Sequence, residues 1–202
     1  MVKMVVFTVA LTYAKKRRGY SSYKGEIGDA PGNIVARDFR ADAPNRLWPT
    51  DVTQFRIPAG KAYLSPVIDC FDGMPVAWTI GERPDAEMAN TVLEEACATL
   101  GPGEAPVIHS DRGCHYRWPG WLEICERHGL EHSMSRKGCS PDNSAMEGLS
   151  GRLKNEFFYG RDWEGVSLED FVSQLDDYMR YYRCERIKRS LGWMGPSQYR
   201  KL

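Results

Sequence analysis

The chain has 202 residues, of which 42% are hydrophobic, so it is long and apolar enough to form one domain with a real core. Its 27 basic and 27 acidic residues give a net charge of zero, which argues against a protein that binds nucleic acid through overall positive charge. The six cysteines are scattered without paired spacing, which argues against a secreted disulfide scaffold and favours a reducing cytoplasm.

Charge is distributed unevenly along the chain. Residues 1–46 hold 9 basic and 4 acidic residues, residues 47–135 hold 6 and 13, and residues 136–202 hold 12 and 10. The basic ends are suited to binding a phosphate backbone. Bound cations would offset part of the acidic charge in the middle block.

The first 13 residues are apolar, and basic residues follow them. A signal peptide carries its positive charge before the apolar stretch, and a membrane span needs about 20 apolar residues, so we expect neither a leader nor a membrane partner. Residues 14–46 predict an irregular segment. We therefore treat residues 1–46 as a basic N-terminal arm, a candidate remnant of a DNA-binding region.

Three strands are predicted next, over residues 47–57, 61–69 and 74–81. The turns between them are short, which indicates an antiparallel meander. A helix should begin at Pro84 or Asp85 and run to Leu100, because apolar residues recur on one helical face and glycines follow.

Helices and strands alternate in the remainder of the chain. A meander followed by such alternation predicts a mixed five-stranded sheet with helices on its faces, an α/β fold of the ribonuclease H-like arrangement. The expected elements are a buried strand over 105–109, a helix over 119–128, a strand over 130–135, a loop over 137–142, and helices over 143–158 and 167–183.

Three acidic residues are the main candidates for chemistry. Asp51 follows a strand pattern, Asp111 closes the apolar run 106–111, and Glu147 lies near the start of a predicted helix. If folding brings them together, the three carboxylates cannot all stay ionised without cations. An all-oxygen site of this kind suits Mg²⁺ or Mn²⁺. Any one of them alone is more often an ordinary acid at a strand end or on a helix surface.

Several short motifs follow one another along the chain. They are residues 45–53 (NRLWPTDVT), 63–72 (YLSPVIDCFD), 109–116 (HSDRGCHY), 135–138 (SRKG), 142–147 (DNSAME), 153–156 (LKNE) and 181–192 (YYRCERIKRSLG). With this order and spacing, the chain resembles the OrfB-type transposases of the third insertion-sequence family, whose catalytic core is similar to retroviral integrase. The resemblance runs from about Lys15 to the end and implies the same ribonuclease H-like fold.

The resemblance also implies a function. The family's catalytic triad, which is also its metal-ligand set, falls on Asp51, Asp111 and Glu147. The expected activity is that of a DDE transposase, which cleaves and transfers DNA strands with two Mg²⁺ or Mn²⁺ ions per site during DNA transposition. Residues 47–160 would form the integrase-like core, and residues 161–202 would form a helical extension of that core.

The partners implied are double-stranded DNA at the element ends and at the target, further copies of the chain, and a helix-turn-helix product of a partner reading frame. The implied location is the bacterial cytoplasm, in association with the nucleoid. The apolar start differs from the helical DNA-binding region that precedes the core in this family, so a truncated copy and a start in another frame are both open.

Two residues share a predicted helical face with Glu147. Asn143 precedes it by four residues and Lys154 follows it by seven, spacings that place all three on one side of a regular helix. Lys154 is therefore a candidate phosphate contact, with a solvated surface lysine as the alternative. Asn143 is a candidate DNA contact that orients the loop, or else a helix cap.

Further contacts are predicted in the loop before Asp142 and in the C-terminal tail. Lys137 is a candidate DNA contact in that loop. Arg183, Arg186 and Lys188 belong to a basic cluster that either binds the DNA backbone or forms a solvated helix end.

His109 and His115 flank Asp111, and we expect them to support the ligands from behind rather than to react. His115 stands where many members of the family carry glutamine.

Two other functions remain open at this stage. One is a metal-dependent nuclease of the same fold, and the other is a catalytically idle DNA-binding fragment of a decayed element.

Overall fold

The computed structural model describes residues 30–138 and 140–202. Its strands are β1 (Leu47–Pro49), β2 (Thr53–Ile57), β3 (Gly60–Ile68), β4 (Pro75–Gly81), β5 (Val107–Ser110) and β6 (Glu131–Met134). Its α-helices are α1 (Ala86–Cys97), α2 (Pro119–Arg127), α3 (Ser144–Leu153), α4 (Leu168–Cys184) and α5 (Pro196–Tyr199). Short 3-10 turns cover Cys114–Arg117, Ser140–Asn143 and Arg189–Leu191. This order agrees with the predicted alternation of elements.

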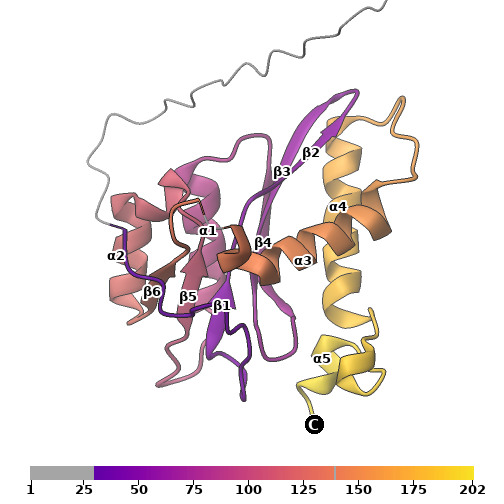
Figure 1. Cartoon of the computed structure of the whole chain (residues 1–202). Helices are drawn as coiled ribbons and strands as arrows, with labels where there is room; N and C mark the ends of the chain where they lie inside the picture. The colour runs from indigo at the N-terminus through magenta and orange to yellow at the C-terminus, as the bar shows by residue number, and fades with distance from the viewer. Residues whose placement is uncertain (1–29, 139) are drawn as a thin grey trace, which may run out of the picture.

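The strands form two ladders that one interrupted strand joins. Strands β1, β5 and β6 pair in parallel, whereas β2, β3 and β4 form the expected antiparallel meander. Thr50 links the ladders through an antiparallel bridge to Val67 of β3. With β1 and β2 counted as halves of one interrupted strand, the described residues form the mixed five-stranded sheet that the sequence predicts (Figure 1).

The interruption corrects the prediction of one continuous strand over 47–57. Pro49 has no N–H to donate to a ladder. The Asp51 carboxylate accepts a hydrogen bond from the Val52 N–H at 2.8 Å, so the side chain takes a donor that a continuous strand would use for pairing. The chain therefore leaves the parallel ladder at residue 50 and enters the antiparallel one at residue 53.

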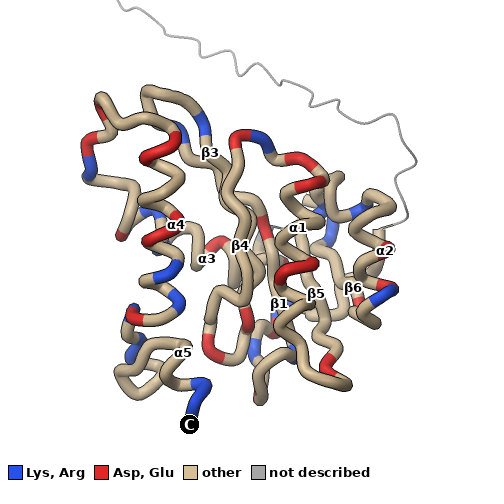
Figure 2. Tube along the Cα trace, turned by 180° about the vertical axis from the view of Figure 1, so that it is seen from behind, with Lys and Arg blue, Asp and Glu red and all other residues tan. Residues whose placement is uncertain are grey.

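Two hydrophobic clusters hold helices against the sheet. Helix α1 covers the sheet face seen in Figure 2, and its buried side chains meet those of α2 and the parallel strands, with Trp48, Ile108 and Trp121 at the centre. Asp85 caps α1 by accepting a hydrogen bond from the Met88 N–H at 3.0 Å. On the other side, α4 packs on the meander through a second cluster that includes Phe55 and Phe171.

Helix α3 crosses the face of the sheet seen in Figure 1. The expected regular helix over 143–158 is wrong in its second half, because α3 ends at Leu153 and a π-helical turn covers Lys154–Phe158. The Tyr159 N–H donates to the Lys154 carbonyl across five residues, and Phe157 is buried against Trp163. Lys154 itself keeps α-helical dihedrals, and the wider turn changes the direction of the side chains that follow it.

The predicted N-terminal arm falls only partly within the described chain. Residues 1–29 lie outside the described residues, and residues 30–46 form neither helix nor strand. None of the helices in the described part is long and apolar enough to cross a membrane.

Candidate active site

Asp51 and Asp111 lie side by side because of strand register. In the parallel pair β1–β5, Pro49 is opposite His109, and each aspartate comes two residues later on its own chain segment. The Thr50 N–H donates to the His109 carbonyl at 2.8 Å and keeps the two segments together beyond the ladder. Parallel pairing thus brings acids 60 residues apart to the same edge of the sheet.

Glu147 reaches the same place from α3. The buried Asn143 side chain donates from its amide to the Thr50 carbonyl at 3.3 Å, which fixes the start of the helix beside Asp51. A hydroxyl pair, Thr53 and Ser150, lies 2.6 Å apart further along. Asn143 makes no side-chain cap on α3, so the capping alternative is wrong, and its predicted role in orienting the loop stays a prediction.

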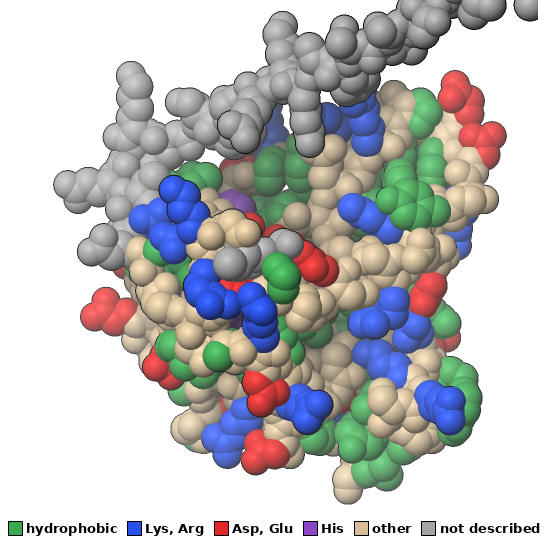
Figure 3. All heavy atoms as spheres, viewed as in Figure 1, with side chains coloured by type: hydrophobic (Ala, Val, Ile, Leu, Met, Phe, Trp, Pro, Cys, Tyr) green, Lys and Arg blue, Asp and Glu red, His purple; other side chains and the backbone are tan. Residues whose placement is uncertain are grey.

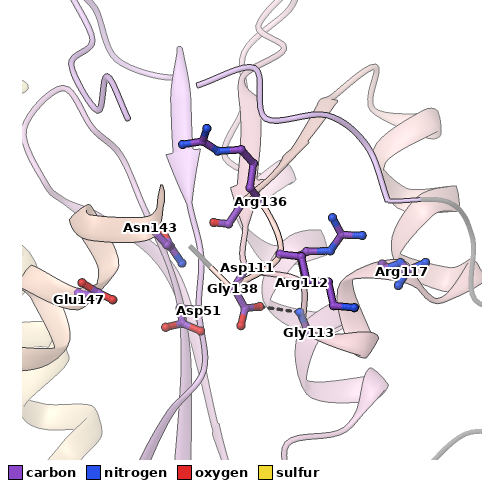
Figure 4. A pocket seen from close by; sticks show the side chains of 11 residues that line it. Asp51, Asp111, Arg112, Gly113, Arg117, Arg136, Gly138, Asn143 and Glu147 are labelled. Carbon is purple, nitrogen blue, oxygen red and sulfur yellow. Dashed lines mark hydrogen bonds between the residues drawn. The ribbon is translucent and has the colours of Figure 1, made fainter. Parts of the chain in front are cut away.

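The three acids border one cleft of about 700 Å³. Figure 4 shows the three carboxylates across the cleft in the spatial order Glu147, Asp51 and Asp111, each from a separate segment of the chain. Asp51 and Asp111 each use their Oδ1 atom to accept a backbone N–H at 2.8 Å, from Val52 and Gly113 respectively. These bonds orient each carboxylate and leave its other oxygen for the cleft.

The carboxylates repel one another. The pKa of Asp51 is raised from 3.8 to about 6, first by burial and then by the negative charge of Asp111, with a smaller contribution from Glu147. The Val52 N–H and the positive charge of Lys154 act in the opposite direction. No lysine or arginine of the described residues forms an ion pair with any of the three acids.

Glycine is required at position 113. A Cβ atom there would lie 2.9 Å from the Asp111 Oδ1 and 2.8 Å from the His115 ring. Only glycine lets the backbone approach the carboxylate closely enough to donate its N–H.

Basic residues also line the cleft. Lys137, predicted as a DNA contact, lies there with Asn143. Sequence reasoning missed three arginines that also line the cleft, Arg112, Arg117 and Arg136. The sequence pointed to two of them only through their neighbours, because Arg112 follows Asp111 and Arg136 precedes Lys137, and both neighbours are predicted site residues.

Asp142 anchors the loop that carries Arg136 and Lys137. Its side chain is fully shielded from solvent and accepts from the Arg37 Nε at 2.6 Å, the Arg136 Nε at 2.8 Å and the Asn33 amide at 3.0 Å. The two guanidinium groups, Arg136 first, hold the pKa of Asp142 far below its usual range. We call Asp142 with these three partners the Asp142 clasp; it ties residues 33–37 to the edge of the cleft.

The two predicted supporting histidines lie beside the acids and not in the cleft. His109 is fully buried, with its ring nitrogens 2.9 Å from the Ser133 hydroxyl and 2.8 Å from the Asp142 carbonyl. His115 packs edge-on against Tyr116 at 4.0 Å between ring centroids. Burial lowers the pKa of both imidazoles, so both are neutral near pH 7. Their supporting role therefore stays a prediction that this placement favours.

The remaining predicted DNA contacts do not line the cleft. Lys154 is near enough to Asp51 to lower its pKa, and its ammonium lies 5.9 Å from the centre of the Phe55 ring. Arg183, Arg186 and Lys188 lie at the end of α4 and after it. Arg186 pairs with Glu156, and Lys188 donates to backbone carbonyls of the turn after β3.

The fold and the cleft together define the structural class to which the protein belongs. Two stretches, residues 41–140 and 147–202, match family models described as integrase core domain. The structure of the HTLV-2 integrase catalytic core domain in complex with magnesium superimposes with a TM-score of 0.61 at 18% identity, over 80% of this chain and 99% of that one. The fold is therefore the ribonuclease H-like fold of integrase cores, as the sequence predicts.

The family within that class follows from closer relatives. The chain is 54% identical over 185 residues to a probable transposase for insertion sequence element IS1353 of Shigella flexneri, which covers 92% of this chain and 36% of that protein. It is 40% identical over 200 residues to the putative transposase InsK for insertion sequence element IS150 of Escherichia coli K12, which covers 98% of this chain and 70% of that protein. The chain belongs to the insertion-sequence transposases with an integrase core, and the nuclease and idle-fragment alternatives are not favoured.

Proposed function

We propose that this chain is the catalytic part of a DDE transposase that cleaves and joins DNA strands with bound divalent cations. One observation carries the proposal: acids that follow β1 and β5 and an acid of α3 border one cleft that basic side chains also line. Acidic groups without a cationic partner suit metal ions, and guanidinium and ammonium groups suit phosphates. A phosphodiester in the cleft would meet both.

The donor set fits Mg²⁺ or Mn²⁺. All three groups are carboxylates, and burial together with the negative charge of Asp111 raises the pKa of Asp51. As the side chains stand, no three His, Cys, Asp or Glu residues of the described part converge tightly enough to hold one ion. Asp51, Asp111 and Glu147 are the residues that would share two ions. When bound, these ions would activate a water or a 3′-hydroxyl and stabilise the leaving oxygen.

The chain's own residues then have simpler tasks. The N–H groups of Val52 and Gly113 orient the aspartates before any ion arrives. Lys137 and Arg136 at the cleft edge hold the phosphodiester, and Lys154 offsets part of the charge at Asp51. No serine or tyrosine nucleophile is required, because water and a DNA 3′-hydroxyl are the attacking groups.

The assembly and its setting are part of the proposal. The substrates are double-stranded element ends and target DNA, bound by several copies of the chain, with a helix-turn-helix product of a partner frame as a further subunit. The work is done in the bacterial cytoplasm at the nucleoid. Residues 1–46 serve as a basic arm, residues 47–160 as the core and residues 161–202 as its extension. The partial coverage of the Shigella relative leaves room for further DNA-binding parts.

Charge-removing substitutions of the triad test this function. Asp51→Asn, Asp111→Asn and Glu147→Gln keep side-chain shape but remove the charge that holds a cation. Each should lower nicking and strand joining on element-end DNA by at least about a thousand-fold, with an unchanged circular dichroism spectrum. Asp38→Asn, at an exposed aspartate outside the cleft, is the matched control and should behave as wild type.

Metal dependence gives a second readout. Mg²⁺ or Mn²⁺ should support both reactions, whereas the larger Ca²⁺ should support DNA binding with little chemistry. Full activity in the presence of a chelator, or near wild-type activity of any triad variant, would remove the corresponding residue or ion from the proposal.

A further inference from the structure

A second cleft, of about 590 Å³, lies on the other side of α3 from the predicted triad. Figure 3 shows basic side chains gathered between α3 and the C-terminal part of the chain. The turn after β3 forms one wall, with Asp72 and Gly73, and the segment from Arg186 to Leu191 forms the other. Its charged lining residues are Asp72, Arg152, Arg186, Lys188 and Arg189.

Positive charge in this cleft exceeds the negative charge available to it. Asp72 is already paired with Arg200, whose Nε lies 2.6 Å from its carboxylate. Arg186 is paired with Glu156. Within residues 30–138 and 140–202, no carboxylate lies at ion-pair distance from Arg152 or Arg189.

Lys188 adds a third cation without a carboxylate partner. Its half-buried ammonium donates to the carbonyls of Asp72 at 3.0 Å and Gly73 at 2.7 Å. Burial lowers its pKa to about 8, and the charges of Arg186 and Arg152 act in the same direction. The charge of Asp72 acts in the opposite direction but is already paired with Arg200, so a bound anion would relieve the repulsion between Lys188 and the nearby arginines.

Lys188 is held in place by its surroundings. Lys188 and Met194 form an antiparallel bridge that closes the turn between them. Gly73 has a positive φ of 66°, and a Cβ atom there would lie 2.7 Å from the Lys188 ammonium. The base of the site is therefore arranged before a ligand binds, which lowers the entropic cost of binding.

The position of Arg152 connects this cleft to the first one. Arg152 and Glu147 lie on the same helix, five residues or about 7.5 Å apart along its axis. The Arg152 guanidinium extends back along α3, to 4.0 Å from where a Cβ on Gly148 would be. A strand whose reacting phosphate lies in the first cleft would need little additional length to reach the second.

The lining also suits a nucleotide chain better than a small anion. The rings of Phe71 and Tyr199 pack 5.6 Å apart beside the cations, and Ile187 is 58% exposed at the rim. Aromatic and aliphatic surface next to positive charge accommodates sugars and bases beside their phosphates.

We propose that this second cleft binds a phosphodiester of the same DNA molecule, a few nucleotides from the one in the first cleft, through Arg152, Arg189 and Lys188. This inference rests on the proposed function for the identity of the DNA. It changes the predicted roles in the tail: Lys188 forms the base of the site, Arg186 is held by Glu156, and Arg152 and Arg189 make the phosphate contacts.

The test is a salt titration of element-end DNA binding by the full chain, with Arg189→Ala, Arg152→Ala and the double variant. Each lost phosphate contact should lower the slope of log affinity against log salt by about 0.9, so the double variant should lose nearly two units. Arg83→Ala removes one exposed positive charge outside both clefts and should leave the slope unchanged. Circular dichroism should be unchanged in all of them.

A wild-type slope in the double variant would overturn the proposal. A change in oligomeric state by sedimentation, without a change in slope, would also overturn it and would make the cleft a protein interface. Nicking is measured separately. Absence of nicking in the wild type refutes the proposed function alone, and normal nicking with an unchanged double-variant slope refutes the second site alone.

Discussion

Asp51 lines the cleft and the buried Asp142 anchors the loop at its edge, and their carboxylates are in opposite electrostatic states. Asp142 is enclosed by Arg37, Arg136 and Asn33, which hold its pKa far below the usual range. Asp51 is buried beside two acids, and only the Val52 N–H and Lys154 act against them, so its pKa rises to about 6. The chain neutralises one shielded aspartate completely and leaves the other without a cation.

The difference separates a structural carboxylate from a candidate ligand. Asp142 contributes to stability by joining residues 33–37 to the cleft loop. Its charge is already paired with Arg37 and Arg136, so a metal cation would find no unpaired carboxylate to bind there. Asp51 makes the folded chain less stable at neutral pH, a cost that persists only where the surrounding structure maintains it. Such unpaired charge is expected where a ligand from outside completes the site.

Among the changes that test the difference between Asp51 and Asp142, removing the Asp142 charge should have the largest effect on nicking and on thermal stability. Asp142→Asn leaves Arg37 and Arg136 without their shared partner, so the loop that carries Lys137 should loosen and nicking should fall at least about tenfold. The melting temperature should drop by roughly 5–10 °C. Nicking rate and thermal unfolding measure both effects.

The matched control for this variant is Asp38→Asn, since Asp38 is an exposed aspartate next to Arg37. Arg37→Lys should retain more activity than Arg37→Ala, because a lysine keeps the positive charge beside Asp142. It should still be less active than wild type, because the hydrogen bond from the Arg37 Nε is lost. Wild-type melting and nicking in Asp142→Asn would show that the clasp does not position the loop.

Removing the Asp51 charge should have the opposite effect on stability. The folded pKa is about 6 and the unfolded value is 3.8, so the folded state binds the proton more tightly. Folding stability should therefore rise as pH falls from 7 towards 4, by up to about 3 kcal/mol. Asp51→Asn should be more stable than wild type at pH 7.5, and the difference should largely vanish at pH 4.

Urea unfolding at the two pH values measures this difference. Asp42→Asn, at an exposed aspartate remote from the cleft, should change stability little at either pH. If Asp51→Asn is destabilising at pH 7.5, burial and the neighbouring acids do not make the charge of Asp51 a net cost to the folded chain.

The sequence predicted the sheet better than the contacts between distant segments, and the triad stays a prediction. Hydrophobic alternation and turn residues located every strand to within a few residues, apart from the break at residues 50–52. The side-by-side placement of Asp51 and Asp111 follows from the parallel pairing of their strands, which the fold class implies. Motif order and spacing supplied the rest of that prediction.

Contacts between distant segments were beyond sequence reasoning. The bond from Arg37 to Asp142 spans 105 residues, and neither residue has a local pattern that signals it. The π-helical turn after Leu153 depends on packing between Phe157 and Trp163, so the 3.6-residue period failed there. Sequence reasoning treated Arg186 and Lys188 as unpaired, because their partners, Glu156 and the carbonyls after β3, lie far away in sequence.

Lys154 offers the finest test of the comparison, because within residues 30–138 and 140–202 it is the cation whose charge lowers the pKa of Asp51. It begins the π-helical turn and does not line the cleft. Lys154→Ala should lower the slope of log DNA affinity against log salt by at most about 0.9. It should also raise the pKa of Asp51 further, because the offsetting charge is gone.

The control for Lys154 must be chosen from the structure. Glu156, two residues on, is unsuitable because its carboxylate accepts from Arg186 at 2.8 Å and from the Tyr178 hydroxyl at 2.7 Å, so Glu156→Ala would disturb the second cleft. Arg83→Ala removes one exposed charge without touching either cleft. If Lys154→Ala and Arg83→Ala titrate alike with salt, while the pH dependence of stability shifts only in Lys154→Ala, then Lys154 tunes Asp51 and does not contact DNA. If the salt slope falls only in Lys154→Ala, the DNA backbone reaches beyond the cleft to the π-helical turn.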